Sequence, residues 1–300
     1  MSAARTKSTV GIIGLGIMGG AFARNLVASG WQVVGYDIDP ARCRELTKAG
    51  VTIAKDAAAL AAAVPTIITS LPKPQALVNT AKAIAAAGVS RRVVVEASTF
   101  TIADKQKAER VLGAAGHLLL DCPISGTGSQ AATGDLVIYA SGDRKAIKAL
   151  QPMFAGFSRK TYDVGAFGNG SKMKYVANLL VAIHNVASAE AMVLGIKAGL
   201  DPQAIFDMIS NGAGNSRVFE LRAPMMVHNR YGEATMKCSV WQKDMDVIGA
   251  YAKSLKAPTP LFDATLPVYA AALKQGHAND DTAAVCAVLE KKAGVKRKRR

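Results

Sequence analysis

Two groups of residues in this sequence have the types and spacing needed for redox chemistry beside a nucleotide. Near the start stands the run Gly14-Leu15-Gly16-Ile17-Met18-Gly19, and in the second half Gly168 and Gly170 are followed by Lys174 and Asn178. The first group is typical of a turn that holds a dinucleotide, and the second supplies a lysine able to move a proton. Together they favour a dehydrogenase over a binding module.

The glycine run lies where a dinucleotide-binding turn requires it. An apolar β run at residues 10–13 leads directly into the glycines, a helical pattern follows from Met18 to Gly30, and residues 31–36 predict a second strand. In this setting Gly14 permits the tight turn, Gly16 lets a pyrophosphate approach the backbone, and Gly19 lets helix and strand pack closely. The helix amino terminus offers free N–H groups to the phosphates. We therefore predict that residues 14–19 bind the cofactor.

Asp37 ends the predicted second strand. A carboxylate at this position accepts hydrogen bonds from the adenosine ribose hydroxyls and repels a 2′-phosphate, which favours NAD over NADP. Arg42, five residues later, would soften that preference, so NADP stays open. Asp39 and Pro40 predict the cap and first turn of the next helix.

Further apolar runs at residues 66–71, 92–96 and 118–121 alternate with helical patterns. Alternation of this kind predicts a Rossmann-type α/β fold with a parallel, doubly wound sheet. Two of these strands end in polar residues, at the edge where such a sheet opens its crevice. We expect cofactor contacts there from Leu71, Pro72, Ser98 and Thr99; Ser98 and Thr99 equally suit a cap for the following helix.

Beyond residue 165 the strand signals stop. Residues 171–198 predict one long helix joining two halves, and residues 201–290 predict further helices only. The expected organisation is a dinucleotide-binding domain at 1–165, an all-helical substrate and oligomerisation domain at 166–295, and a basic tail at 296–300.

Lys174 is the candidate general acid and base. Oxidation of an alcohol to a carbonyl requires a group that takes the hydroxyl proton as hydride leaves carbon, and burial lowers the pKa of a lysine towards the working range. Asn178 lies four residues later, on the same helical face. The alternative is a surface lysine on a charged face, as Lys172 suggests, but the preceding glycines and Asn178 favour the functional interpretation.

These motifs resemble those of the β-hydroxyacid dehydrogenase family, whose best-known member is 3-hydroxyisobutyrate dehydrogenase, and the resemblance covers nearly the whole chain. The similar segments are the extended glycine motif at residues 11–26, the run Asp121-Cys-Pro-Ile-Ser-Gly-Thr-Gly-Ser-Gln-Ala-Ala-Thr-Gly134, the glycine–lysine–asparagine motif at 168–178, and the pair Lys243-Asp244. The carboxyl half resembles the 6-phosphogluconate dehydrogenase type of helical domain and, within the family, the L-threonate dehydrogenase branch.

The resemblance implies roles for further residues. Ser125, Gly126 and Thr127 would bind the carboxylate of a small anionic hydroxy acid, although the family usually has glycine where Thr127 stands. Asn178 would hold the substrate hydroxyl or the lysine, and Lys243 would lie near the cofactor. Asn215 and Ser216 would hold a polyhydroxy acid, with Arg217 replacing the branch's usual aromatic residue. A homodimer or homotetramer is also implied.

Composition limits the other possibilities. The four cysteines and four histidines show no metal-ligand spacing, so we predict packed, reduced thiols and no metal site. The short polar start and the lack of a membrane-spanning run at 57–70 favour the cytoplasm.

The basic charge is concentrated at the carboxyl end. Seven of the positive charges fall within residues 291–300. When these seven are left out, the net charge of the chain falls from +15 to +8. The remaining charge suits an anionic substrate and cofactor, and a solvated terminus is favoured over a nucleic-acid-binding arm.

Two alternative functions stay open. One is an imine or semialdehyde reductase on the same scaffold, which Lys174 disfavours. The other is a non-catalytic, nucleic-acid-associated module that uses the basic tail, which the intact Lys174–Asn178 pair disfavours.

Overall fold

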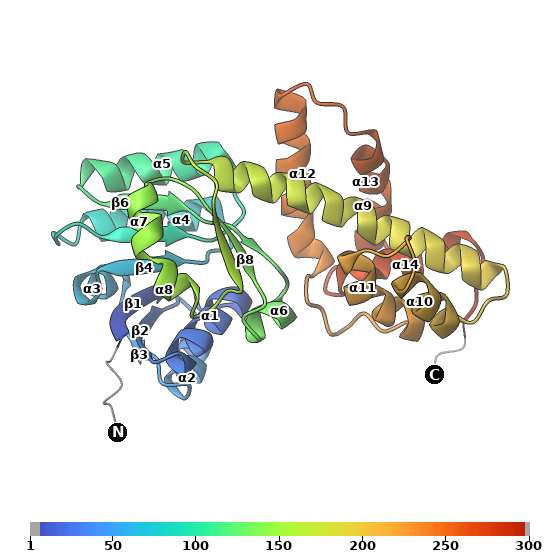
Figure 1. Ribbon diagram of the computed structural model, residues 1–300, viewed down its shortest axis with the longest axis horizontal. Helices are drawn as coiled ribbons and strands as arrows, with labels where there is room; N and C mark the ends of the chain where they lie inside the picture. The colour runs from blue at the N-terminus through green and yellow to red at the C-terminus, as the bar shows by residue number, and fades with distance from the viewer. Residues whose placement is uncertain (1–6, 298–300) are drawn as a thin grey trace. The chain divides into compact units, whose positions relative to one another are not determined.

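The computed structural model describes residues 7–297 (Figure 1). The chain divides into two compact units, one ending at Lys174 and the other beginning at Tyr175. The first is an α/β unit and the second is helical, which confirms the predicted fold class. The long helix α9, Asn169–Lys197, belongs to both units.

A six-stranded sheet forms the centre of the first unit. Its strands are β1 Lys7–Ile13, β2 Trp31–Tyr36, β3 Thr52–Ile53, β4 Thr66–Thr69, β5 Val93–Glu96 and β6 Leu118–Asp121. They are ordered β3-β2-β1-β4-β5-β6, and every neighbouring pair is parallel. This is the order of a doubly wound dinucleotide-binding sheet, and it brings the carboxyl ends of all the strands to one edge.

Alternation along the strands sends successive side chains into two separate cores. Ile12, Ile68 and Leu120 pack in one core with helices α1 (Ile17–Ala28), α2 (Pro40–Thr47) and α8 (Gln151–Phe154). Their neighbours Ile13, Ile67 and Leu119 pack in the other with α3 (Ala57–Ala63), α4 (Pro74–Ala85) and α5 (Ile102–Ala114). Because both faces are covered, the strands are mostly apolar, and β4, β5 and β6 end in the polar residues Thr69, Glu96 and Asp121.

A second, three-stranded sheet was not expected from the sequence. It consists of β7 Ile124–Ser125, β8 Val137–Ala140 and β9 Lys160–Asp163, with β7 and β8 antiparallel and β8 and β9 parallel. Helix α6, Gly128–Ala132, and helix α7, Arg144–Ala149, lie in its connections. A bridge between Asp121 and Ser141 joins the end of β6 to the residue after β8.

The first turn of α9 is anchored at this junction. Asp121 accepts hydrogen bonds from the Ser171 N–H (Oδ2, 2.8 Å) and the Ser171 hydroxyl (Oδ1, 2.8 Å). The Gly170 N–H donates to Ser141 Oγ at 3.0 Å. Since the first N–H groups of a helix lack acceptors within it, these bonds satisfy them, and the helix dipole stabilises the carboxylate.

Gly170 is required for this close approach. A Cβ atom at this position would lie 2.3 Å from the Tyr139 carbonyl oxygen and 2.6 Å from that of Asp121. The second glycine of the motif before Lys174 therefore lets the helix contact the backbone of the two sheets directly.

By length and composition α9 could also cross a membrane, and it is the one described helix that could. It carries buried polar side chains, however, and the first turn is tied to the sheets. Asn185, for example, is fully buried and donates to the Tyr269 hydroxyl and the Thr282 carbonyl oxygen, both at 2.9 Å. We interpret α9 as the core helix of a folded domain.

The second unit continues with α10 Pro202–Ser210, α11 Arg217–His228, α12 Cys238–Ser254, α13 Pro260–Lys274, a 3₁₀ turn at Thr282–Ala284 and α14 Val285–Lys292. Pro202 and Pro260 stand in the first turns of α10 and α13, where the missing N–H of proline costs no helical hydrogen bond. Buried Asp281 accepts from the N–H groups of Thr235 and Met236 and lies 3.7 Å from the Arg222 guanidinium. This carboxylate fixes the loop before α12.

The predicted solvated carboxyl terminus is wrong at Arg297. Its guanidinium pairs with Glu290 and donates to the carbonyl oxygens of Val227 (3.0 Å) and Met226 (2.6 Å) near the end of α11. A helix carboxyl end carries unsatisfied carbonyl groups, which attract a cation. Residues 298–300 of the predicted tail lie outside the described residues.

Substitution Gly170→Ala tests the docking of α9. The added methyl group must displace backbone, so we expect the free energy of unfolding to fall by about 2 kcal/mol or more. Urea unfolding measures the change. Gly113→Ala is the matched control, because a Cβ at this helical glycine meets nothing within 4 Å. Equal stability of both variants would contradict the close approach.

Candidate functional site

The glycine turn joins β1 to α1 in the geometry that a dinucleotide needs. Gly14 has a φ of +90°, and a Cβ there would lie 2.1 Å from the Ser70 carbonyl oxygen. Gly16 is the N-cap of α1 and has no side chain to accept from the first turn. The N–H groups at this helix start are therefore available for an anion.

Asp37 stands beside this turn, with its side chain largely buried. Its Oδ2 accepts from the Leu15 N–H at 2.7 Å, and its Oδ1 accepts from the Asp39 N–H at 2.8 Å. The Arg42 guanidinium lies 3.5 Å from Oδ2. The carboxylate is thus fixed at the end of β2, where the sequence placed a ribose-binding residue. Asp39 caps α2 as predicted, accepting from the Ala41 N–H at 2.9 Å.

A hollow of about 620 Å³ runs along this edge of the sheet. Its lining includes Gly14, Asp37, Arg42, Leu71 and Pro72. The structure therefore brings together predicted cofactor residues from the ends of β1, β2 and β4. A cavity of this size, bounded by the first glycine of the turn and an acidic side chain, fits the adenosine half of a dinucleotide.

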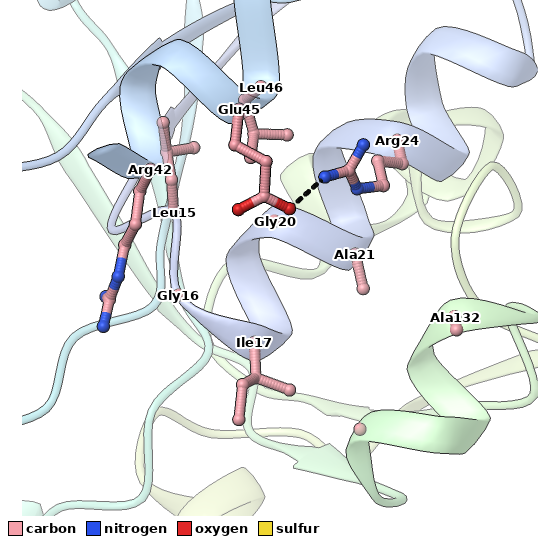
Figure 2. Close-up of a pocket in the computed structure, with 11 residues that line it drawn as sticks. Leu15, Gly16, Ile17, Gly20, Ala21, Arg24, Arg42, Glu45, Leu46 and Ala132 are labelled. Atoms are coloured by element: carbon pink, nitrogen blue, oxygen red, sulfur yellow. Dashed lines mark hydrogen bonds and ion pairs between the residues drawn. The ribbon is translucent and has the colours of Figure 1, made fainter. Parts of the chain in front are cut away.

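A second hollow, of about 400 Å³, is also lined by Arg42 (Figure 2). Leu15, Gly16 and Ile17 line it, and so do Gly128 and Ala132 of α6. In Figure 2 Arg42 extends alongside Gly16, away from the Arg24–Glu45 ion pair (2.5 Å). Arg42 lines both hollows, so one guanidinium lies near both the glycine turn and the Asp37 carboxylate.

The carboxyl ends of β4 and β5 are joined through Ser98. Its hydroxyl accepts from the Leu71 N–H at 2.9 Å, and its own N–H donates to Glu96 Oε1 at 2.9 Å. The cap of α5 is Thr101, which accepts from the Asp104 N–H at 3.1 Å. The alternative that Ser98 or Thr99 caps this helix is therefore wrong, because the chain turns into α5 two residues later.

The predicted carboxylate-binding loop has an internal partner that the sequence analysis missed. Ser125 lies on β7, and Thr127 is the N-cap of α6. The Thr127 N–H donates to Gln130 Oε1 at 3.1 Å, and its hydroxyl lies 2.9 Å from that of Ser129. The Thr-x-x-Gln spacing of a capping box would have identified Gln130. One N–H expected to face the substrate is thus already bonded.

Lys174 lies at the end of the first unit, on the second turn of α9, and only 8% of its surface is exposed. The anchored first turn fixes where its side chain begins. The alternative of a surface lysine therefore does not hold for Lys174. It describes Lys172 instead, which is exposed and donates to Asn169 Oδ1 at 3.1 Å.

The remaining predicted residues belong to the second unit. Buried Asn178 donates to Asp244 Oδ2 at 2.9 Å, and the Lys243 ammonium lies 2.9 Å from Asp244 Oδ1. Asp244 is a polar partner that the sequence analysis noted only as part of a pair. Its burial, with 5% exposure, indicates that it holds the Asn178 amide in one orientation.

Asn215 and Ser216 have local partners. The Asn215 amide donates to the Ser210 carbonyl oxygen at 2.9 Å and to Glu220 at 2.8 Å. The Ser216 hydroxyl caps α11 by accepting from the Phe219 N–H at 3.1 Å. Both side chains therefore hold the turn before α11, and their predicted contact with substrate stays a prediction.

No group of three or more histidine, cysteine, aspartate or glutamate side chains is placed to hold a metal ion within residues 7–297. The four cysteines are free thiols, and Cys122, Cys238 and Cys286 are buried. Burial raises the pKa of Cys238 and Cys286 to about 12, so both are protonated at neutral pH.

The doubly wound sheet, the uncapped glycine turn and the acidic side chain after β2 define a dinucleotide-dependent oxidoreductase. Residues 9–165 match the NAD-binding domain of 6-phosphogluconate dehydrogenase. Residues 168–289 match the NAD-binding domain of NADP-dependent 3-hydroxyisobutyrate dehydrogenase.

Individual relatives match most of the length of this chain. L-threonate dehydrogenase of Cupriavidus necator is 32% identical, over 93% of this chain and 95% of the relative. The Escherichia coli K12 enzyme of the same name is 31% identical, over 93% and 94%. The crystal structure of 3-hydroxyisobutyrate dehydrogenase from Salmonella typhimurium has a TM-score of 0.86 at 29% identity, over 94% of this chain and all of that one.

The chain belongs to the 3-hydroxyisobutyrate dehydrogenase family, as the sequence motifs predicted. It is an NAD(P)-dependent hydroxyacid dehydrogenase, and NAD or NADP is its cofactor.

Asp37→Ala tests the ribose contact. Removing the carboxylate removes both the hydroxyl acceptor and the repulsion of a 2′-phosphate, so the ratio of kcat/KM with NAD to that with NADP falls by about tenfold or more. Steady-state kinetics with each cofactor measures it. Asp143→Ala, which removes the remote cap of α7, leaves the ratio unchanged. If Asp37→Ala also leaves it unchanged, Asp37 does not contact the ribose.

Proposed function

We propose that this chain transfers hydride between a small hydroxy acid, of the L-threonate or 3-hydroxyisobutyrate type, and NAD or NADP. Lys174 acts as the general acid and base. The observation that carries this proposal is a largely buried lysine one turn after an anchored helix start. A lysine in that setting is held in place and partly desolvated, as proton transfer at neutral pH requires.

The bound nicotinamide supplies the hydride acceptor. The residues fit the dinucleotide, since the 620 Å³ hollow and the uncapped start of α1 lie side by side along the sheet edge. Lys174 takes the proton from the substrate hydroxyl through Nζ in oxidation and returns it in reduction. Asn178, on the same face of α9, orients the substrate hydroxyl or the lysine, and Asp244 fixes its amide.

The substrate carboxylate is assigned to the loop after β6. The Ser125 hydroxyl and the Gly126 N–H are its donors, and the Thr127 hydroxyl adds a third polar group. The Thr127 N–H joins them only when the Gln130 side chain moves away. Lys243 lies near the cofactor in this proposal, while Asn215 and Ser216 hold the far hydroxyls of a polyhydroxy acid.

Two sets of relatives support the substrate class. L-threonate dehydrogenases from several bacteria are 30–32% identical to this chain, which favours a four-carbon polyhydroxy acid. A glyoxylate/succinic semialdehyde reductase of Arabidopsis thaliana is 28% identical over 94% of the chain. Reduction of a semialdehyde is therefore the second candidate, with Lys174 as proton donor.

Asp37 favours NAD as the preferred cofactor. It is held by two backbone N–H groups in the position that meets the ribose hydroxyls. Arg42 borders the same hollow and would bind a 2′-phosphate. The predicted cytoplasmic location and homodimer or homotetramer stay predictions.

Lys174→Ala lowers kcat by at least about two orders of magnitude, because general acid–base catalysis contributes this much or more. Cofactor affinity stays close to that of the wild type. Lys172→Ala, two residues earlier and exposed, is the matched control and keeps full activity. Nicotinamide absorbance gives the rate and NADH fluorescence the affinity. An equal loss of cofactor affinity in Lys174→Ala would show that this lysine is structural.

Nicotinamide reduction with a panel of acids identifies the substrate. The panel contains L-threonate, D-erythronate, 3-hydroxyisobutyrate and glycerate, each with NAD and NADP. We expect Lys174-dependent turnover, highest with L-threonate. No nicotinamide reduction with any of the four acids, while the cofactor still binds, would overturn the proposed substrate class.

A further inference from the structure

A buried cluster of three charges lies beneath the carboxyl ends of β5 and β6. The Lys105 ammonium, from α5, is 2.6 Å from Glu96 Oε2 and 2.7 Å from Asp121 Oδ1, and all three side chains are fully buried. Burial by itself would lower the pKa of Lys105, but Asp121 and Glu96 outweigh it and raise the pKa above its ordinary value. Lys105 is therefore charged, and it bridges the last residues of two strands.

Each carboxylate also holds a segment of backbone. On one side Glu96 accepts from the Ser98 N–H, and the Ser98 hydroxyl accepts from the Leu71 N–H. On the other side Asp121 accepts from both the N–H and the hydroxyl of Ser171. One ammonium thus links a cofactor arm, which ends at Leu71, with a helix arm, which ends at Ser171.

The cofactor arm ends at the hollow assigned to the cofactor, and the helix arm ends close to Lys174, the proposed acid and base. Leu71 lines the hollow assigned to the cofactor. Ser171 lies three residues before Lys174, so its position sets where the lysine side chain starts. Hydride and proton transfer depend on the relative placement of these parts, and a misplacement of about 1 Å can lower the rate by about 100-fold.

Stability alone does not explain a buried ammonium. Well-packed apolar side chains of similar volume often stabilise a fold as well as a buried ion pair does. An ammonium between two carboxylates instead sets a fixed distance between them, because it makes a short, charge-assisted hydrogen bond to Asp121 and a close ion pair with Glu96.

We propose that Lys105 is a positioning residue of this dehydrogenase, whose ammonium fixes the cofactor loop at Leu71 relative to the first turn of α9. The proposal rests on the role proposed above for Lys174. Lys105 contacts neither substrate nor cofactor, and it acts through Glu96 and Asp121.

The test is the double variant Lys105→Met/Glu96→Gln. Lys105→Met by itself leaves two buried carboxylates without a counter-ion and is expected to unfold. The double variant carries the same net charge as the wild-type cluster, since Asp121 supplies the one remaining negative charge. The carboxamide that replaces the Glu96 carboxylate can still accept from the Ser98 N–H, so both backbone contacts persist while the bridge between them is lost.

We expect kcat of the double variant to fall about tenfold or more, with the KM for the hydroxy acid changed less than about threefold. Rates are taken per cofactor-binding site, titrated with NADH, so that unfolded protein does not count. Lys107→Met is the matched control, because Lys107 lies on the same helix, is exposed, and pairs only locally, with Asp104 at 3.1 Å. It should match the wild type. Wild-type kcat in the double variant would overturn the proposal.

Hydrogen exchange in the cofactor-free protein gives a second readout that does not depend on turnover. Loss of the bridge is expected to speed exchange of the Leu71 and Ser171 amides together, while Lys107→Met changes neither. Wild-type exchange at either amide would overturn the coupling. Absence of Lys174-dependent turnover in the wild type would instead overturn the proposed function, and exchange would still decide the coupling.

Two end-of-arm variants keep the proposal testable if the double variant does not fold. Ser171→Ala, which removes one contact of Asp121, is expected to lower kcat while the cofactor KM stays unchanged. Ser98→Ala, which removes the acceptor of Leu71, is expected to raise the cofactor KM. Wild-type kinetics in both variants would overturn the proposal.

Discussion

The contact between Asp121 and the first turn of α9 is the interaction on which the candidate site depends. A parallel sheet ends its strands at one edge, and the last residue of β6 places a buried carboxylate there. A helix of 29 residues starts with its N–H groups unsatisfied, and Asp121 together with Ser141 accepts from them. The position of Lys174 follows from that junction, because it lies one turn further along the same helix.

Glycine makes the junction possible. The backbones of β6, β8 and α9 approach so closely at Gly170 that no Cβ atom would fit. The same physical requirement operates at the cofactor turn, where Gly14 lies against the Ser70 carbonyl group. Both glycine motifs of this chain thus lie where the start of a helix packs in direct contact with backbone carbonyl groups at the end of a sheet. The cofactor cradle and the anchored lysine are two uses of the same sheet edge.

Charge within the first unit is arranged around this edge. Lys105 joins Glu96 and Asp121 below it, while Asp37 and Arg42 lie beside the glycine turn. The buried set is held by ion pairs of 2.6 and 2.7 Å. Arg42, by contrast, lies 3.5 Å from Asp37 and is partly exposed, so it is able to meet a ligand. The buried charges of Lys105, Glu96 and Asp121 therefore hold the backbone at the ends of β5 and β6, while the accessible guanidinium of Arg42 lines the cofactor hollow.

The sequence by itself determined the doubly wound sheet, the cofactor turn, α9 and the starts of α1 and α2. These features depend on local patterns: apolar runs for strands buried on both faces, glycines between strand and helix, and Asp-Pro caps. It also placed Asp37, Leu71 and Lys174 where the structure has them at the sheet edge or on α9, because a short motif fixes each residue's position within its own element.

Only the tertiary structure decided the second sheet and the buried cluster. Strands as short as β7 have no periodicity to detect. Lys105 stands among charged residues typical of an exposed helix face, and its burial follows from two strand ends that lie 25 residues apart in the sequence but adjacent in the sheet. Whether a polar residue is solvated or buried depends on what the fold brings against it, and that information is not local.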